Sequence, residues 1–178
     1  MTRIISGIWR GQALPNLKTG TVRPTTDRAR TILFDTLRYF QGLKVLDLFS
    51  GTGALGIEAL SRGAESVLSI DSDPKYVSAQ REWFATREGQ FRVQRADVHR
   101  FLPKLRDTYD IIFADPPYDE TFDDQFFTLI DEHLNEDGTF VYERRRTDQE
   151  DIAVGRLTLY KEKTVADTRI QFYKVAGT

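Results

Sequence analysis

The sequence predicts an α/β fold in which a doubly wound, mostly parallel sheet carries helices on both faces and ends in an antiparallel hairpin. Short apolar runs alternate with helix-like segments from residue 44 to residue 143, and this alternation is typical of βα units. Two further strand-like runs follow, with only residues 165–168 between them. A parallel pair needs a crossover of about a dozen residues or more, so these two strands must form an antiparallel hairpin.

The elements can be assigned in order along the chain. A turn at residues 23–27 leads into a helix whose apolar residues recur at helical spacing, namely Ala29, Ile32, Leu33, Leu37 and Phe40. Gly42 marks the end of this helix. Strands are expected at residues 44–49, 66–71, 91–95, 109–114, 139–143, 157–164 and 169–175. Helices are expected at residues 54–62, 76–84 and 126–134, with a short turn at 99–102.

Length and composition fit a single domain over residues 1–178. The chain is 40% hydrophobic and 29% charged, and no run reaches the roughly 18 apolar residues of a membrane span. It contains no cysteine, which excludes disulfides and thiolate zinc sites. The first residues lack the apolar stretch of a signal peptide. We therefore expect a cytoplasmic monomer without a membrane segment, and we expect His99 and His133 at the surface rather than at a metal site.

Charge is distributed unevenly along the chain. Residues 1–38 contain seven basic and two acidic residues, whereas the remaining 140 contain 18 basic and 25 acidic residues. Residues 1–22 are therefore interpreted as a basic arm or hairpin that contacts phosphate groups. The candidate RNA-binding residues are Arg3, Trp9, Arg10 and Arg23. A solvated surface segment is the alternative for the arm, and packing is an equally good alternative for Trp9. The three arginines at 144–146 adjoin acidic residues and are interpreted as a solvated loop.

A glycine-rich motif follows the first expected strand and points to an adenosine-like ligand. Its candidate ligand-binding residues are Asp47, Phe49, Gly51 and Gly53. Glycines at this point let the backbone turn tightly and approach a ligand closely, and the helix that begins here offers unpaired N–H groups. Asp71 lies 20 residues beyond Gly51, at the end of the next strand, where a carboxylate can accept both hydroxyls of a ribose. We expect only a ligand to need the Asp71 side chain.

Two ligands fit this motif. The spacing of Gly51, Gly53 and Gly56 matches the fingerprint of NAD-binding proteins. Asp47, however, precedes the first glycine by four residues and lies close to the turn. A carboxylate there would disfavour a pyrophosphate but would suit the cationic methionine end of S-adenosylmethionine.

Asp97 and Val98 end the third expected strand. The Asp97 carboxylate could accept the amino group of an adenine, while the backbone N–H of Val98 faces a ring nitrogen. The alternative is an ordinary N-cap for the short turn that follows. Glu58, in the helix after the glycine turn, is expected to serve that helix.

The segment Asp115-Pro116-Pro117-Tyr118 directly follows an apolar strand. Each proline pushes the residue before it toward extended geometry, so this rigid corner can aim the Asp115 carboxylate and the Pro116 carbonyl at one point. Two converging acceptors would bind an NH₂ group and align its lone pair toward a methyl donor. Tyr118 would supply a face for stacking an extruded base. The alternative is a strand-ending turn, but the motif belongs to the strand expected beside the strand of Asp47.

Together these motifs resemble the RsmD family, the bacterial 16S ribosomal RNA guanine-N2 methyltransferases. Residues 3–11 and 23–28 are similar to the amino-terminal signature of that family, and residues 47–64 and 115–118 are similar to its other motifs. The resemblance implies a seven-stranded, Rossmann-like class I methyltransferase fold with S-adenosylmethionine as cofactor. It assigns cofactor contacts to Asp47, Gly51, Gly53, Asp71, Asp97 and Val98, and catalytic roles to Asp115, Pro116 and Tyr118. Where the family usually carries a glutamate, this chain has Asp71.

The resemblance also implies an activity and a partner. The expected reaction is methyl transfer from S-adenosylmethionine to the exocyclic N2 amine of a guanine in 16S ribosomal RNA, presented as RNA or as the small ribosomal subunit. Adenine-N6 methylation of nucleic acid is the runner-up, and an NAD-dependent oxidoreductase is a more distant alternative. An RNA-binding assembly factor with a vestigial cofactor site is a third alternative, against which the acids Asp47, Asp71 and Asp115 argue.

Overall fold

The computed structural model describes residues 2–17, 26–148 and 151–175, and its helices and strands follow the predicted order. Arg23, a candidate RNA-binding residue, lies outside the described residues. The helices are α1 (Asp27–Leu37), α2 (Ala54–Ser61), α3 (Pro74–Phe84), α4 (Val98–Phe101), the 3₁₀ helix η1 (Leu102–Lys104) and α5 (Asp124–Glu132). The strands are β1 (Lys44–Leu48), β2 (Ser66–Asp71), β3 (Phe91–Arg95), β4 (Tyr109–Ala114), β5 (Leu134–Arg145), β6 (Leu157–Val165) and β7 (Thr168–Val175).

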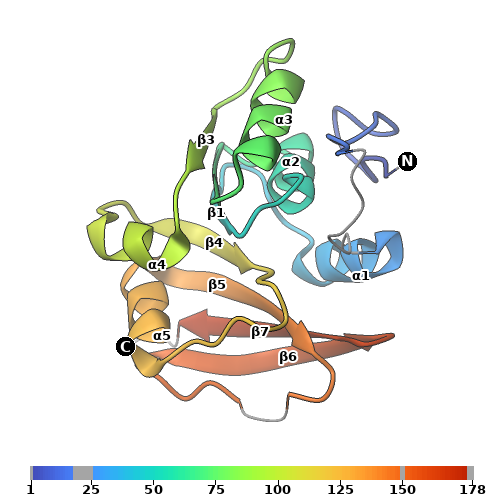
Figure 1. Ribbon diagram of the computed structural model, residues 1–178. Helices are drawn as coiled ribbons and strands as arrows, with labels where there is room; N and C mark the ends of the chain where they lie inside the picture. The colour runs from blue at the N-terminus through green and yellow to red at the C-terminus, as the bar shows by residue number, and fades with distance from the viewer. Residues whose placement is uncertain (1, 18–25, 149–150, 176–178) are drawn as a thin grey trace.

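One seven-stranded sheet, in the order β3-β2-β1-β4-β5-β7-β6, forms the centre of the molecule (Figure 1). Strands β3, β2, β1, β4 and β5 pair in parallel, whereas β7 runs antiparallel to both β5 and β6. The hairpin between β6 and β7 turns at Ala166, whose φ is 51°. The predicted fold class is confirmed, because the βα units give the parallel part and the short last connection forces one antiparallel strand into it.

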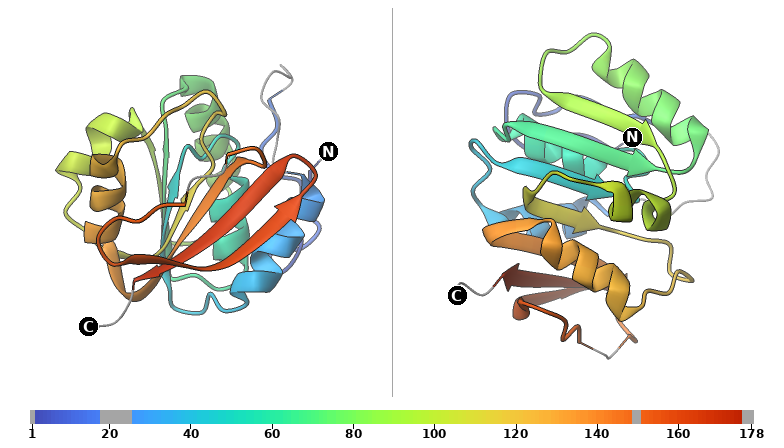
Figure 2. Two further views of the ribbon diagram at one scale, coloured as in Figure 1. Left: turned by 90° about the horizontal axis from the view of Figure 1, so that it is seen from below. Right: turned by 90° about the vertical axis from the view of Figure 1, so that its left-hand side faces the viewer.

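Helices cover both faces of the sheet (Figure 2). Helices α1, α2 and α3 pack on one face in a core that includes Phe34, and α4 and α5 pack on the other in a core that includes Leu102. Neighbouring residues of β1 point to opposite faces, as strand geometry requires. Val45 therefore lies in the first core and Leu46 in the second, both inaccessible to solvent.

Strand β5 is longer than the sequence predicts. It begins at Leu134, where the end of the preceding helix was expected, instead of at residue 139. Asp137 takes a left-handed φ of 62°, and the register against β4 shifts between Tyr109 and Ile111. An irregular backbone among polar residues carries no alternating apolar signal, so the pattern hides this first part of the strand.

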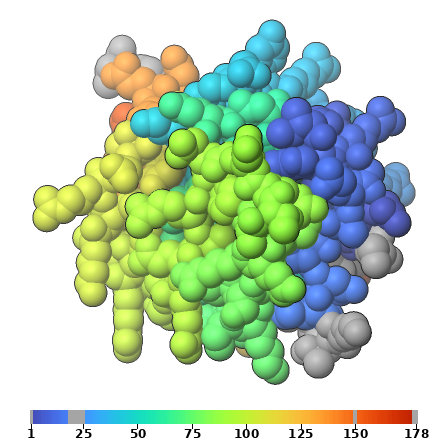
Figure 3. Space-filling model, turned by 90° about the horizontal axis from the view of Figure 1, so that it is seen from above, coloured from blue at the N-terminus to red at the C-terminus, as the bar shows by residue number. Residues whose placement is uncertain are grey.

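The amino-terminal arm, residues 2–17, contains an antiparallel bridge and is docked on α2. Figure 3 shows the dark blue arm lying directly against the green part of the surface. Glu58 of α2 is fully buried and accepts hydrogen bonds from the backbone N–H groups of Ile5 (2.9 Å) and Ser6 (3.0 Å). The expectation that Glu58 serves its own helix is therefore incomplete, since this carboxylate also holds the arm on the domain.

Trp9 of the arm is a core residue. Only 8% of it is exposed, and its ring meets the Trp83 ring edge-on with 5.2 Å between the ring centroids. The indole N–H of Trp83 donates to the carbonyl oxygen of Ala13 at 2.7 Å. The structure thus favours the packing alternative for Trp9, because a buried ring offers no free face to an RNA base.

His133 differs from its expected place at the surface. It is 8% exposed, and its ring nitrogens lie 3.1 Å and 3.2 Å from the carbonyl oxygens of Asp107 and Leu102. The expectation is wrong because the ring lies inside the protein, between two backbone carbonyl oxygens, one of which can accept its N–H. Across the described part of the chain, no helix is long and apolar enough to cross a membrane, and no group of three or more potential metal ligands is found.

We expect Glu58→Ala to lower the free energy of unfolding by about 2–4 kcal/mol, because two backbone donors of the arm lose a charged acceptor. Denaturant titration measures this change. Glu65→Ala, at an exposed position before β2, is the matched control and should change the stability by less than about 0.5 kcal/mol. Hydrogen exchange at the amides of Ile5 and Ser6 should accelerate in the Glu58 variant, and wild-type protection there would contradict the docking role.

Candidate active site

The carboxyl ends of the parallel strands form one edge of the sheet, and the predicted cofactor and catalytic residues lie along it. Because β1 lies between β2 and β4, the turn after β1 has Asp71 on one side and Asp115 on the other. Leu48 of β1 pairs with Ala114 of β4, and Ala114 pairs with Tyr142 of β5. The residues that come next, Asp115 after β4 and Glu143 in β5, therefore lie side by side.

Two glycines shape the turn after β1 for different reasons. Gly51 and Gly53 have φ values of 54° and 80°, in the left-handed region that favours glycine. A Cβ atom on Gly53 would come within 2.6 Å of Gln80 Oε1, whereas a Cβ atom on Gly51 would meet nothing within 4 Å. Packing thus requires glycine at position 53. Gly51 leaves open space where a ligand would approach the backbone.

Two side chains from neighbouring elements hold this turn. Gln80 of α3, fully buried, donates from Nε2 to the carbonyl oxygen of Gly51 (2.7 Å) and to Ser50 Oγ (2.9 Å). Asp71 accepts from the backbone N–H groups of Gly51 (2.8 Å) and Asp73 (2.9 Å). The expectation that only a ligand needs Asp71 is therefore wrong. Gln80 was not predicted from the sequence, where its one signal is a polar residue at the spacing of the buried face of α3.

Asp47 is buried beneath the turn. It is 1% exposed and accepts a 3.0 Å hydrogen bond from the N–H of Gly56 in α2. Burial raises the pKa of Asp47 from 3.8 to about 8; the Gly56 hydrogen bond opposes this rise, and the charges of Asp115 and Asp71 add to it. A positive charge beside Asp47 would offset the cost of ionising it, so this end of the site suits a cationic ligand rather than a pyrophosphate.

Asp97 and Val98 stand at the start of α4. Asp97 caps the helix, with its Oδ1 accepting the backbone N–H of Arg100 at 3.1 Å. Val98 is 3% exposed and lies in the second core. The capping alternative is therefore realised. The cap occupies only one oxygen of the exposed Asp97 carboxylate. Contact of Asp97 and of the Val98 N–H with an adenine stays a prediction.

At the acceptor end, Asp115 lies beside a carboxyl group that the sequence analysis did not single out. Glu143 of β5 is 3% exposed, and its side chain is hydrogen-bonded to that of Asp115. Within the described ranges, no donor reaches Glu143 Oε1. Burial raises the pKa of Glu143 well above its ordinary value, and the charge and hydrogen bond of Asp115 and the charge of Asp47 raise it further. Two hydrogen-bonded carboxyl groups must share a proton, and burial places that proton on Glu143.

Tyr118 projects from the corner after β4, in which Pro116 is buried. Tyr118 is 37% exposed, and its hydroxyl lies 3.2 Å from Thr168 Oγ1 of β7. The Arg145 guanidinium lies over the tyrosine ring, 5.0 Å from its centroid. The interpretation of residues 144–146 as a solvated loop is therefore wrong in part, since Arg145 belongs to β5 and supports Tyr118.

An aromatic cluster anchors the segment that follows Tyr118. The Phe122 ring contacts that of Phe49 and stacks on that of His99, with centroid distances of 5.7 Å and 5.4 Å. His99 Nε2 lies 2.8 Å from Glu120 Oε1. The segment thus folds back onto the end of β1 and onto α4, and Phe49 contributes to this cluster.

These features define a class of protein. Open space at Gly51, the Asp71 carboxylate at the rim and the buried Asp47 below fit the backbone approach, the ribose hydroxyls and the positive charge of S-adenosylmethionine. A rigid corner with a carboxylate lies across the switch point of the sheet, where open α/β sheets bind ligands. The protein is a class I, S-adenosylmethionine-dependent methyltransferase.

Comparisons with known proteins give the family. The family model described as Conserved hypothetical protein 95 matches residues 2–174. Ribosomal RNA small subunit methyltransferase D of Haemophilus influenzae is 32% identical over 97% of this chain and 93% of that protein. YlbH of Bacillus subtilis is 38% identical over 98% of this chain and its whole length. The solved structure of yhhF from Escherichia coli has a TM-score of 0.88 and 30% identity, covering 98% and 97% of the two chains. The chain belongs to the RsmD family, which sets aside the NAD-dependent alternative.

The raised pKa of Asp47 predicts how stability depends on pH. Its pKa of about 8 in the folded protein exceeds the ordinary value of 3.8, so the native state binds the extra proton between these values. The resulting stabilisation is complete at low pH and is lost as the pH rises toward 8. The free energy of unfolding of the ligand-free protein should therefore fall by an amount on the order of a few kcal/mol between about pH 5 and about pH 8.

Urea titrations at a series of pH values measure this dependence. Asp47→Asn keeps an acceptor for the Gly56 N–H but cannot titrate, so it should flatten the curve. Glu143 shifts in the same direction and should supply the slope that remains. Glu65→Gln serves as the exposed control and should follow the wild type. A slope that Asp47→Asn leaves unaltered would show that Asp47 is not the titrating group.

Proposed function

We propose that the protein transfers a methyl group from S-adenosylmethionine to the exocyclic N2 amine of a guanine in 16S ribosomal RNA. Relatives from Haemophilus influenzae and Escherichia coli that match most of the chain are named ribosomal RNA small subunit methyltransferase D. The observation that carries the proposal is the pair of neighbouring carboxyl groups, Asp115 and Glu143, at the acceptor end of the site. This pair adjoins the buried Asp47 of the cofactor end.

The acidic acceptor end favours guanine over adenine. The Watson–Crick edge of guanine presents two adjacent donors, the N1–H and the N2 amine, and one carboxylate can accept from both. Adenine presents an acceptor, N1, beside its amine, and a carboxylate would repel it. Adenine-N6 methylation therefore remains the second candidate.

The residues of the acceptor end position the amine. S-adenosylmethionine, when bound, supplies a methyl group carried on a positively charged sulfur. Asp115 and the carbonyl of Pro116 accept the N–H bonds of the amine and turn its lone pair toward the donor. The nitrogen becomes positive as it gains the methyl group; Asp115 stabilises this charge and takes the released proton. Tyr118, supported by Arg145, supplies the face on which the extruded base stacks.

Glu143 acts through Asp115 and is a positioning residue. Its protonated carboxyl group donates to Asp115, which fixes the direction of the remaining Asp115 lone pairs. The burial of Glu143 at 3% exposure keeps water from competing for this hydrogen bond. Asp115 thus meets the amine with its orientation already set.

The basic arm is proposed to contact the RNA. Arg3 and Arg10 are exposed, and the Arg3 guanidinium donates to the carbonyl oxygen of Gly11 at 2.8 Å. Because Glu58 docks the arm on α2, both cations are held at a fixed place relative to the site. Such contacts to phosphate position an RNA without reading its sequence.

A methyl-transfer assay tests the proposed function. Purified protein is incubated with isotope-labelled S-adenosylmethionine and either 16S ribosomal RNA or small subunits from cells that lack the gene. Digestion to nucleosides and mass spectrometry should then show N2-methylguanosine. Detection of N6-methyladenosine instead would favour the second candidate, adenine-N6 methylation. Absence of transfer to both substrates would overturn the proposal.

We expect Asp115→Asn to lower kcat by roughly 10²-fold or more, because the variant keeps an acceptor but loses the charge that stabilises the transition state. Calorimetric affinity for S-adenosylhomocysteine should stay within about twofold of the wild type, since the residue faces the acceptor. Asp119→Asn, an exposed acid in the same corner, is the control. A main defect in cofactor binding, or wild-type turnover, would count against the assigned role.

Two variants of Glu143 separate positioning from packing. Glu143→Gln keeps a donor toward Asp115, so kcat should remain within about fivefold of the wild type, whereas Glu143→Leu removes the donor and should lower kcat by about tenfold or more. KM for S-adenosylmethionine should change little in both. Equal loss in the two variants would indicate that Glu143 does not work through this hydrogen bond.

A further inference from the structure

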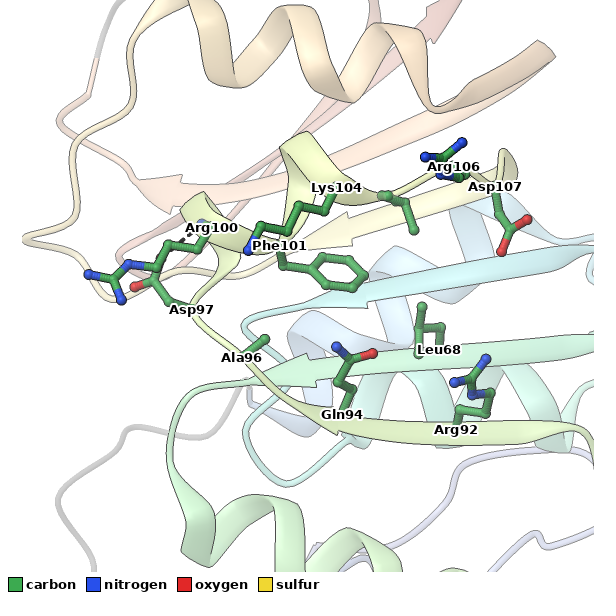
Figure 4. A pocket seen from close by; sticks show the side chains of 11 residues that line it. Leu68, Arg92, Gln94, Ala96, Asp97, Arg100, Phe101, Lys104, Arg106 and Asp107 are labelled. Atoms are coloured by element: carbon green, nitrogen blue, oxygen red, sulfur yellow. Dashed lines mark hydrogen bonds between the residues drawn. The ribbon is translucent and has the colours of Figure 1, made fainter.

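A hollow on the second face of the sheet extends away from the site described so far. It has a volume of about 520 Å³. Figure 4 shows Arg92 and Gln94 of β3 on one side and Phe101 and Lys104 on the other, with Leu68 of β2 between them. Its size suits a stretch of a ligand rather than a single ion.

The hollow exists because the connection between β3 and β4 is short. The crossover contains only α4, of four residues, and η1, of three. A parallel sheet usually has helices over both faces, but this crossover is too short to cover β2 and β3. Within β3 only Val93, which faces the first core, is buried; Arg92 and Gln94 are exposed.

The rim of the hollow is rich in unpaired cations. Arg92, Arg100, Lys104 and Arg106 all line it and are exposed. In the part of the chain that the structure describes, none of these four side chains forms an ion pair. Two acids, at positions 97 and 107, also line the hollow, so the cations exceed the acids by two. Phosphate groups are the charged partners that such a rim fits.

One end of the hollow adjoins the cofactor end of the site. Asp97, a candidate for the adenine contact, lines one end of it. His99 of the same helix lies 2.8 Å from Glu120 in the segment after the acceptor corner. A polymer that enters the acceptor end could therefore continue over α4 into the hollow.

We propose that this hollow binds the sugar–phosphate backbone of the substrate RNA, beside the nucleotide that is methylated. The proposal rests on the function proposed above. Arg92, Lys104 and Arg106 contact phosphates, and Phe101 and Leu68 form an apolar floor for the ribose rings. RNA is favoured over a protein partner because four cations and only two acids line the hollow, so its excess charge is positive.

The test compares two pairs of substitutions that remove the same charge. Arg92→Gln with Lys104→Gln alters the hollow, and Lys161→Gln with Lys163→Gln alters exposed residues of β6, at the opposite edge of the sheet. Binding of a labelled 16S ribosomal RNA fragment is measured by anisotropy over a range of salt concentrations. The hollow variant should bind about tenfold more weakly and reduce the salt slope by about 1–2, whereas the control should match the wild type.

Further measurements decide between the explanations. Affinity for S-adenosylhomocysteine and the unfolding temperature should be unchanged in the hollow variant, and Arg92→Glu with Lys104→Glu should bind RNA more weakly still. Wild-type affinity and salt slope in the hollow variants would overturn the proposal. Weakened binding to small ribosomal subunits with unchanged binding to bare RNA would also overturn it, in favour of a protein partner. Failure of the wild type to methylate both 16S ribosomal RNA and small subunits would overturn the proposed function. The RNA affinities of the variants test the hollow separately.

Discussion

The cost of burying negative charge governs the design of the active site. The sheet order places β1 next to β4 and β4 next to β5, and this brings the side chains of Asp47, Asp115 and Glu143 together at neighbouring strand ends. Three carboxylates so close together would repel one another, and the buried Asp47 and Glu143 would lose their hydration. Without a ligand, this cost is lowered by protonation of the acids and by the hydrogen bond that the Gly56 N–H donates to Asp47. A cationic cofactor would neutralise this charge more effectively. The same acids that destabilise the ligand-free protein therefore strengthen its binding of the cofactor.

The glycine turn that lies over Asp47 is itself held in place by neighbouring side chains. Gly51 is held from both sides, by Asp71 on its N–H and by Gln80 on its carbonyl oxygen. The short side chain of Asp71 reaches the backbone directly at 2.8 Å, and this contact gives the aspartate a structural task where the family usually carries a glutamate. A turn fixed in this way needs little rearrangement when a ligand arrives, which lowers the entropic cost of binding. The same turn also stores some backbone strain, because Phe49 takes a left-handed φ of 56°.

The sequence predicted the fold and much of the site because their signals are local. Alternating apolar runs and the short last connection sufficed for the sheet, and motif spacing located Asp47, Gly51 and Asp115. Glu143 and Gln80 escaped prediction, because a single polar residue in a buried strand or helix face acquires meaning only from its spatial neighbours. His133 was misplaced for the same reason, since the backbone carbonyls that satisfy it come from a distant segment.

The number of basic residues in a segment of the sequence does not predict how many of them are available to bind phosphate. The basic excess of residues 1–38 suggested a strongly cationic RNA-binding surface, but exposure and hydrogen bonding reduce it. Arg30 is fully buried, with one guanidinium nitrogen bonded to the carbonyl oxygen of Arg3 and to Asp27. By contrast, the four cations near α4 fall within residues 92–106, close to the acids at positions 97 and 107, and attracted no notice, yet the short crossover leaves them exposed around one hollow. The cations available to phosphate thus depend on which parts of the sheet the connections leave uncovered, and a count of basic residues along the chain does not show this.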